Sequence, residues 1–231
     1  MRIRPATDAK AKRLGLLLAA KGREASDPEL ADVVADAQLL GSLELAGFRS
    51  SWEEVRASRL SGNGPEEVRA VRRAQAAVPG GALVTVAAVR AWHEALLGKL
   101  GFRQTERERD DAATAPPERI EERLQTLEEW LCSAGVRDLK PEQAAGLAYA
   151  RILEILPFED GNGRVARLAA SQLMVGGGQP PPILAAADGP YLRACLNAAF
   201  RLDTGPLVSL LAEASSRALD VMIQTLERGE A

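Results

Sequence analysis

The chain has 231 residues, of which 46% are hydrophobic and 26% charged, and its formal net charge is −3. This composition is typical of a soluble globular protein, and the slightly acidic balance gives no reason to expect a nucleic-acid or membrane partner. The sequence has no run of about 18 apolar residues, so it predicts no membrane span. Its beginning lacks a signal-peptide pattern, and we therefore expect a cytoplasmic protein.

Apolar residues recur at helical spacing along most of the chain, and no alternating strand pattern stands out. Capping residues and prolines indicate where helices begin, and glycines indicate where they end. Ser51 and Glu54, for example, form a capping-box pattern, and Thr85 caps a helix expected to end before Gly101. In chain order, helices are expected at about 7–18, 28–40, 51–61, 65–78, 85–100, 116–131, 141–155, 161–175, 188–202 and 206–227.

Two other stretches lack this periodicity. The segment from Gln104 to Ala115 is polar and strongly charged, which predicts a surface loop or a weak hairpin. The glycine- and proline-rich stretch 176–182 predicts a turn or linker. The fold class is therefore expected to be all-α.

The two cysteines, Cys132 and Cys195, fall within apolar helical patterns. Both are interpreted as reduced thiols of the core, which fits a reducing compartment. A disulfide between them stays open as the alternative.

The most informative segment runs from Leu156 to Arg167 and reads LPFEDGNGRVAR, between two expected helices. Its glycines allow backbone N–H groups to point at one place, and a helix N-terminus adds positive charge there, so the turn can bind phosphate. Arg164 and Arg167 lie on one helix face and match phosphate oxygens. Asp160 can ligate Mg²⁺ shared with those phosphates. The segment predicts a nucleotide polyphosphate site; the alternative is a glycine turn with two surface arginines.

This segment resembles the signature of the Fic family, which reads HPFx(D/E)GNGRxxR, at every position but the first. Gly101-Phe102-Arg103 is similar to the Gly-Tyr-Arg that precedes the family's hairpin flap. The stretches after Pro116 and around Tyr191 are similar to its later helices. The resemblance implies an all-α Fido fold with a short hairpin-like flap. It also implies an N-terminal helical region, 1–84, before a Fic core domain, 85–231.

The activity that this resemblance implies is transfer of AMP from ATP to a hydroxyl group of a target protein. Mg²⁺ and ATP, ADP or AMP are therefore the expected ligands, and a protein target or regulator is the expected partner. Asp160 would hold the metal ion, and Phe158 would anchor the loop from below. The other nucleotide-binding positions that it implies are Gly161, Asn162, Gly163, Arg164, Arg167 and Tyr191.

Leu156 occupies the one mismatched position, where the family has the histidine that accepts the proton of the attacking hydroxyl. Leucine cannot accept a proton, and general-base catalysis is typically worth about 10²- to 10⁴-fold. His93 is the single histidine of the chain, and the family often has a non-catalytic histidine in that helix. Glu154 and Glu159 remain as alternative bases, although Glu154 is expected to point to another side of its helix.

Many Fic proteins restrain themselves with a glutamate in a Ser/Thr-x-x-x-Glu-Gly/Asn motif, where it pairs with a signature arginine. The similar segment here begins at Ser42 and places Ala46 at the glutamate position. Glu44 lies about 200° away round a helix, so we do not expect it to reach that arginine. A shift of two residues in this alignment would instead make Glu44 the inhibitory residue.

We therefore expect a nucleotide-binding Fic protein with little or no AMP transfer. One alternative is an active protein adenylyltransferase, or another nucleotide-dependent transferase, that uses a non-standard base. Another is a structural or partner-binding helical module. Retention of Asp160, Arg164 and Arg167 favours a nucleotide-binding protein over the structural module.

Overall fold

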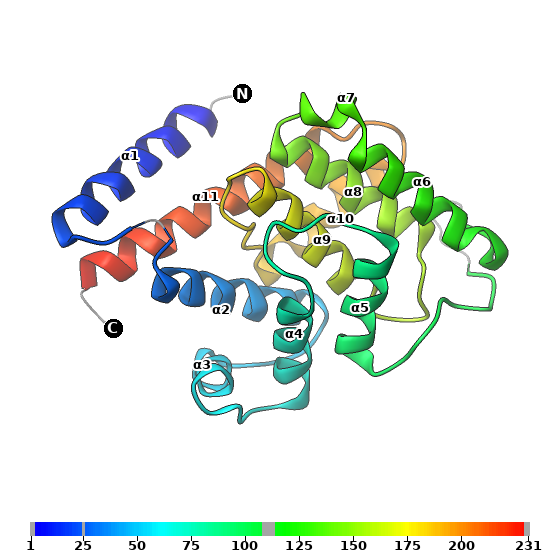
Figure 1. Ribbon diagram of the computed structural model, residues 1–231, viewed down its shortest axis with the longest axis horizontal. Coiled ribbons are helices and arrows are strands. Elements are labelled where there is room, and N and C mark those ends of the chain that lie inside the picture. The colour runs from blue at the N-terminus through cyan, green and yellow to red at the C-terminus, as the bar shows by residue number, and fades with distance from the viewer. Residues whose placement is uncertain (1–2, 25, 108–113, 229–231) are drawn as a thin grey trace.

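The computed structural model describes residues 3–24, 26–107 and 114–228. Over these residues the protein is built from helices and contains no strand, as expected (Figure 1). Two short 3₁₀ helices, η1 (Pro117–Arg119) and η2 (Ala186–Asp188), precede α6 and α10. The α-helices are α1 (Ile3–Lys21), α2 (Pro28–Leu45), α3 (Trp52–Ser61), α4 (Glu66–Ala77), α5 (Val86–Leu97), α6 (Ile120–Cys132), α7 (Ala134–Arg137), α8 (Pro141–Ile155), α9 (Asn162–Gly176), α10 (Gly189–Ala199) and α11 (Gly205–Arg228).

The helix ends follow the capping residues closely. The Ser51 hydroxyl accepts a hydrogen bond from the Glu54 amide at 3.2 Å, and the Glu54 carboxylate accepts one from the Ser51 amide at 2.8 Å. Helix α5 ends at Leu97, before the expected Leu100, because Gly98 adopts a left-handed conformation with φ 64°. Such a glycine ends a helix without steric cost. Helix α1 begins at Ile3, ahead of the expected start, and the short α7 was not predicted.

The main hydrophobic core lies around α8 and α9, which pack against each other in the middle of the molecule. Small side chains such as Ala148, Ala166 and Ala169 are fully buried there and let the two helices approach closely. The same core includes Leu39 and Leu43 of α2. Residues on both sides of the expected boundary at 84/85 therefore share one core.

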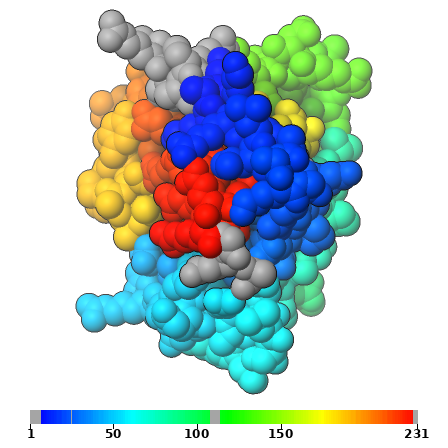
Figure 2. Space-filling model, turned by 90° about the vertical axis from the view of Figure 1, so that its left-hand side faces the viewer, coloured from blue at the N-terminus to red at the C-terminus, as the bar shows by residue number. Residues whose placement is uncertain are grey.

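A second apolar cluster joins the two ends of the chain. Leu14 and Leu18 of α1 pack against Leu219, Ile223 and Leu226 of α11. Figure 2 shows this face, where α1 lies against the red C-terminal helix. Within the described ranges, no helix combines the length and the apolar character that a bilayer span requires.

The cysteine prediction was half wrong. Cys195 is buried, with 1% of its surface exposed, but Cys132 is the last residue of α6 and is exposed. The buried stripe of α6 runs through Ile120, Leu124 and Leu127, and Cys132 falls beside this stripe at the helix end. Both thiols are free, so the disulfide alternative is excluded.

Residues 104–107 and 114–115 form the described parts of the expected flap, and neither part contains a strand. Residues 108–113, where the tip of a hairpin was expected, lie outside the described residues. The described flap begins beside the C-terminal end of α8, since the Arg103 amide donates to the Pro157 carbonyl at 2.9 Å.

Candidate functional site

The loop between α8 and α9 is held in a defined shape by its own side chains and backbone. Asn162 is buried, and its side-chain oxygen accepts from the Phe158 amide at 2.9 Å while its side-chain nitrogen donates to the Phe158 carbonyl at 2.7 Å. Gly161 precedes α9 with φ 82°, a conformation that glycine adopts readily. The Asn162 side chain therefore closes the loop, and any contact of this residue with phosphate would come from its backbone.

Phe158 anchors the loop from below. It is 1% exposed, and its ring stacks on the His93 ring with centroids 3.7 Å apart and an interplanar angle of 3°. His93 is itself 4% exposed, and its Nδ1 lies 3.2 Å from the Lys99 carbonyl. The histidine is thus placed beneath the loop, on the side away from the open surface, and it does not line the cleft described next.

An open cleft of about 390 Å³ lies above the loop. It is bounded by the end of α2, the flap, the end of α8 and the start of α9. The structure thereby brings together most of the residues that the sequence singled out. The lining residues are Leu45, Ala46, Phe48, Arg107, Leu153, Leu156, Glu159, Asp160, Gly161, Asn162, Gly163, Arg164 and Arg167.

Two of the predicted nucleotide-binding residues, Phe158 and Tyr191, do not line this cleft. Phe158 is buried beneath the loop, whereas Tyr191 lies on the first turn of α10 and is 53% exposed. Its phenol interacts with the Cys195 thiol one turn further along α10, which raises the pKa of Tyr191.

Arg164 projects from the first turn of α9 and is 95% buried, with 5% of its surface exposed. Burial lowers the pKa of its guanidinium, although arginine stays charged at neutral pH. One guanidinium nitrogen lies 3.4 Å from the Asp160 carboxylate, and the group sits over the Phe48 ring at 5.3 Å from its centroid. A buried cation with one weak partner is poorly compensated, which favours an anionic ligand.

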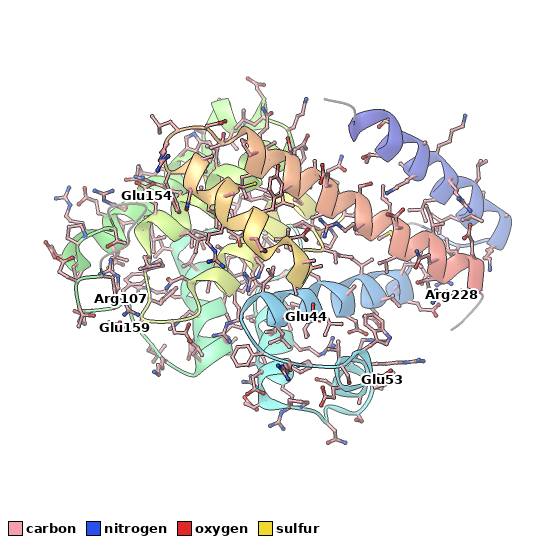
Figure 3. All side chains as sticks on the ribbon, turned by 180° about the vertical axis from the view of Figure 1, so that it is seen from behind. Glu44, Glu53, Arg107, Glu154, Glu159 and Arg228 are labelled. Atoms are coloured by element: carbon pink, nitrogen blue, oxygen red, sulfur yellow. The ribbon has the colours of Figure 1, made fainter. Side chains whose placement is uncertain are left out.

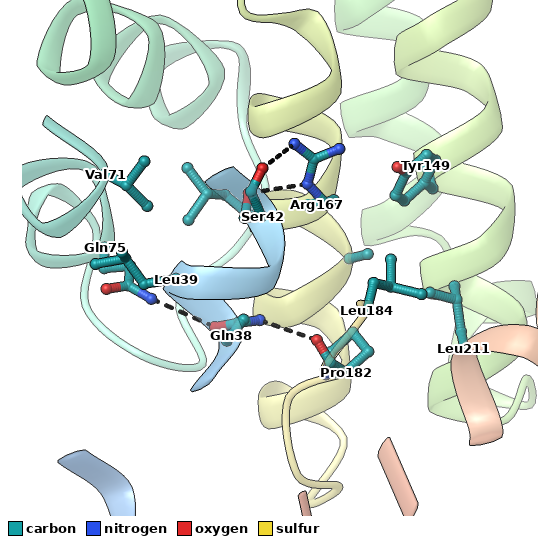
Figure 4. A pocket seen from close by; sticks show the side chains of 12 residues that line it. Gln38, Leu39, Ser42, Val71, Gln75, Tyr149, Arg167, Pro182, Leu184 and Leu211 are labelled. Carbon is teal, nitrogen blue, oxygen red and sulfur yellow. Dashed lines mark hydrogen bonds between the residues drawn. The ribbon is translucent and has the colours of Figure 1, made fainter. Parts of the chain in front are cut away.

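Arg167 lies one turn further along α9 and is fixed by α2. Its Nε donates to the Ser42 hydroxyl and a terminal nitrogen donates to the Ser42 carbonyl, both at 2.9 Å (Figure 4). These groups border a small internal cavity between α2 and α9 that Tyr149 also lines. Within the described part of the chain, Arg167 makes no salt bridge, so its charge has no acidic partner there.

The glycines of the loop are required by close packing. A Cβ added to Gly163 would lie 3.3 Å from a terminal nitrogen of Arg167, and one added to Gly161 would lie 3.1 Å from the Leu97 side chain. Larger residues would therefore displace an arginine or the loop itself.

Asp160 is the one predicted metal ligand, and its carboxylate points outward. The side chain is 78% exposed; Oδ1 accepts from the Gly161 amide at 2.6 Å, and Oδ2 faces Arg164. Among the described residues, no group of three or more His, Cys, Asp or Glu side chains is arranged to hold a metal ion. A single carboxylate fits Mg²⁺, which proteins commonly bind through one or two carboxylates together with substrate phosphates.

Leu156 lines the cleft in an unusual backbone conformation. It caps α8 in the left-handed region, with φ 51° and ψ 61°. Residues other than glycine are uncommon there, and Asn, Asp and His are the types enriched in it. Leucine therefore occupies a position whose backbone suits a histidine better.

The two alternative bases lie in different places, as Figure 3 shows. Glu154 pairs with Arg151 at 2.6 Å and does not line the cleft. Glu159 does line it, but its carboxylate accepts a hydrogen bond from the Thr105 hydroxyl at 2.6 Å and lies beside Arg107. Both of its carboxylate oxygens are thus engaged by neighbouring side chains.

At the end of α2, Ala46 lines the cleft, whereas Glu44 is exposed and does not. In the described residues, Glu44 forms no salt bridge with Arg164 or Arg167; the ion pair of Arg164 is with Asp160. The end of α2 therefore presents a methyl group, and no carboxylate, to the signature arginines.

The sequence predicted no role for Arg103, but in the structure it connects the flap to the end of α8. It is 2% exposed, and its guanidinium donates to the carbonyls of Leu156 and Thr105, each at 2.6 Å, and to that of Ala115. It thus ties both ends of the flap to the end of α8. The only sequence signal was its place in Gly101-Phe102-Arg103, because its partners are backbone groups far along the chain.

The fold and the cleft define a helical protein with a glycine-rich loop at a helix N-terminus, beside two arginines. Residues 83–174 match the model of the Fic/DOC family. The protein adenylyltransferase Fic of Nematostella vectensis is 30% identical over 122 residues, covering 53% of this chain and 29% of that protein. Residues 83–174 are thus similar to the Fic/DOC family, and the chain spans less than a third of the curated relatives that it matches.

Solved structures share the fold. Fic-1 from C. elegans superposes with a TM-score of 0.76 at 20% sequence identity, covering 96% of this chain and 71% of that one. IbpAFic2, solved while covalently tethered to Cdc42, has a TM-score of 0.50 at 18% identity, covering 80% of this chain and 63% of that one. These neighbours are all-α Fic proteins, and one of them has been seen with a protein partner.

Proposed function

We propose that the cleft binds ATP or ADP together with Mg²⁺ and that the protein transfers little or no AMP. The single observation that carries this proposal is the convergence of Arg164, Arg167 and Asp160 at the N-terminus of α9, in one open cleft. A helix N-terminus, a glycine loop and two arginines attract a phosphate chain by charge and by hydrogen bonding.

The charge balance supports a polyanionic ligand. Among the described residues, the carboxylate near buried Arg164 is that of Asp160 at 3.4 Å, and the groups that hold Arg167 are the neutral groups of Ser42. The phosphates of a nucleotide would supply the negative charge that the protein does not. Asp160 would hold Mg²⁺ on its exposed carboxylate, where the ion would neutralise phosphate charge.

The catalytic part of the proposal rests on Leu156. The curated relative is a protein adenylyltransferase by name, and transfer of AMP to a protein hydroxyl needs a group that accepts the hydroxyl proton. Leu156 offers none, and the imidazole of His93 is stacked beneath the loop. Without a general base we expect a rate about 10²- to 10⁴-fold below that of a histidine-containing site. The partner of such a protein would be a regulator or a target that it binds without efficient modification.

Isothermal titration calorimetry with ATP tests the binding proposal in the presence and absence of Mg²⁺. We expect saturable binding that Mg²⁺ strengthens, a loss of this Mg²⁺ effect in Asp160→Asn, and weak binding in Arg164→Ala. Asp138→Asn, which changes a carboxylate outside the cleft, is the matched control and should bind like the wild type. Absence of heat with ATP, ADP and AMP, together with no thermal shift, would overturn the proposal. A structural or partner-binding helical module would then remain as the function.

A further inference from the structure

We propose that Arg107, in the flap, is a third arginine of the nucleotide site and contacts the phosphate chain alongside Arg164 and Arg167. This inference rests on the proposed function, because it concerns the same cleft. It adds a residue outside the signature and assigns the flap a role in binding the nucleotide itself.

Arg107 lies at the edge of the cleft, close to the loop between α8 and α9. It lines the cleft together with Arg164 and Arg167, although it lies more than 50 positions earlier in the chain. Figure 3 shows Arg107 beside Glu159, at the edge of the signature loop. One guanidinium nitrogen donates to the Glu159 carbonyl at 2.7 Å. Arg107 is therefore already docked on the backbone of the loop that would hold the phosphates.

The described part of the flap before Arg107 is held in place by hydrogen bonds. Arg103 binds the carbonyls of Thr105 and Ala115 at the two ends of the flap, and the Thr105 hydroxyl donates to the Glu159 carboxylate at 2.6 Å. Arg107 follows Thr105 by two residues. The backbone that leads to Arg107 is thus already held beside the cleft, which lowers the ordering cost of ligand binding.

Among the described residues, the one ion pair of Arg107 is with Glu159. It is long, with Nε 3.5 Å from the carboxylate oxygen, and both side chains are about half exposed, at 47% and 48%. Such a pair is weak, whereas a phosphate group can accept two parallel hydrogen bonds from a guanidinium through two of its oxygens. Glu159 is therefore a competitor that a phosphate chain would displace.

The charges of the cleft agree with this arrangement. Three arginines face two carboxylates, and one of these, Asp160, is the proposed ligand of Mg²⁺. A nucleoside triphosphate would offer three phosphate groups to these arginines, whereas a monophosphate would offer one. Arg107 should therefore contribute more to the binding of ATP than to that of AMP.

The test is calorimetry of Arg107→Ala with ATP and AMP in the presence of Mg²⁺. We expect ATP affinity to fall about tenfold, the change that one charge-assisted hydrogen bond produces, with a smaller loss for AMP. Arg119→Ala, an exposed arginine outside the cleft that pairs with Glu122, is the matched control and should bind like the wild type. Unchanged ATP affinity in Arg107→Ala would overturn the inference.

A second variant tests whether Glu159 competes with the phosphate chain for Arg107. Glu159→Gln removes the competing charge but retains an oxygen for the Thr105 hydroxyl, so ATP should bind more tightly than to the wild type. In the Arg107→Ala background the same change should have a smaller effect; an equal effect in both backgrounds would contradict the inference. If the wild type itself binds no nucleotide, the proposed function fails; if the wild type binds and Arg107→Ala is unaffected, only the role of Arg107 fails.

Discussion

Arg167 and Ser42 are joined by two hydrogen bonds, one to the hydroxyl and one to the carbonyl of Ser42, both 2.9 Å long. They connect α9, which carries the signature arginines, to α2, whose C-terminal end borders the same cleft. The contact uses two of the five donors of the guanidinium, and no other bond of this group is found among the described residues. We infer that Ser42 positions Arg167 for a ligand.

Ser42→Ala should weaken ATP binding about threefold to tenfold, because Arg167 loses one of its two fixed contacts and becomes less ordered. Calorimetry measures the affinity, and a denaturation curve shows whether the fold is retained. Ser61→Ala, at an exposed serine whose hydroxyl bonds its own helix, serves as the control. Tighter binding in Ser42→Ala would instead mean that Ser42 restrains Arg167.

Leu156→His should restore AMP transfer, seen as labelling of the protein itself or of lysate proteins with labelled ATP. The expected gain is about 10²- to 10⁴-fold, the usual contribution of a general base. Histidine also suits the left-handed backbone at this position better than leucine does.

Leu156→Asn is the matched comparison, because asparagine also suits that backbone but cannot accept the proton. It should stay as inactive as the wild type. Equal labelling in the asparagine and histidine variants would show that the missing base is not what limits the reaction.

Arg103→Met should lower the free energy of unfolding by about 2–4 kcal/mol, since several buried carbonyls lose their donor. Chemical denaturation measures this change. Arg119→Met removes an exposed arginine of similar size and should change stability by less than about 0.5 kcal/mol. A small effect at Arg103 would mean that water or other donors satisfy those carbonyls.

His93 should make stability fall on mild acidification. Burial lowers its pKa below the usual 6.5, and the nearby Arg164 lowers it further, while Asp160 and the Lys99 carbonyl act in the opposite direction. The unfolded chain therefore binds a proton at a higher pH than the folded one, and stability is lost as the pH falls below about 6.5. Urea denaturation between pH 5 and 7.5 measures this slope.

His93→Gln is the control for that experiment, because His93 is the single histidine of the chain and the variant has no imidazole to titrate. In His93→Gln the slope across this range should be much reduced, whatever the loss of absolute stability. A slope that persists unchanged would assign the pH dependence to other groups.

Much of the fold could be predicted because its signals are local. The cap at Ser51, the proline at the start of α2 and the glycine before α9 each act within one turn of the chain. The cleft residues from Leu156 to Arg167 were also predictable, since one continuous segment of the sequence holds them all. These features depend on neighbours in the sequence and not on the tertiary arrangement.

The features that were missed depend on distant partners. Arg107 reaches the cleft only because Arg103 binds carbonyls of the flap and of α8, which no local pattern reveals. Cys132 was assigned to the core from the apolar residues around it, but its position at the end of α6 leaves it exposed. Tyr191 was placed at the nucleotide by resemblance, and the fold puts it on the outer side of α10.

The stack of His93 on Phe158 also has an experimental use. In proton NMR, the ring resonances of a chain with one imidazole can be assigned without ambiguity, and aromatic ring currents act strongly at a centroid distance of 3.7 Å. Any ligand that shifts the loop above must alter these resonances. The protein thus carries its own spectroscopic reporter directly beneath its cleft, with no label to be introduced.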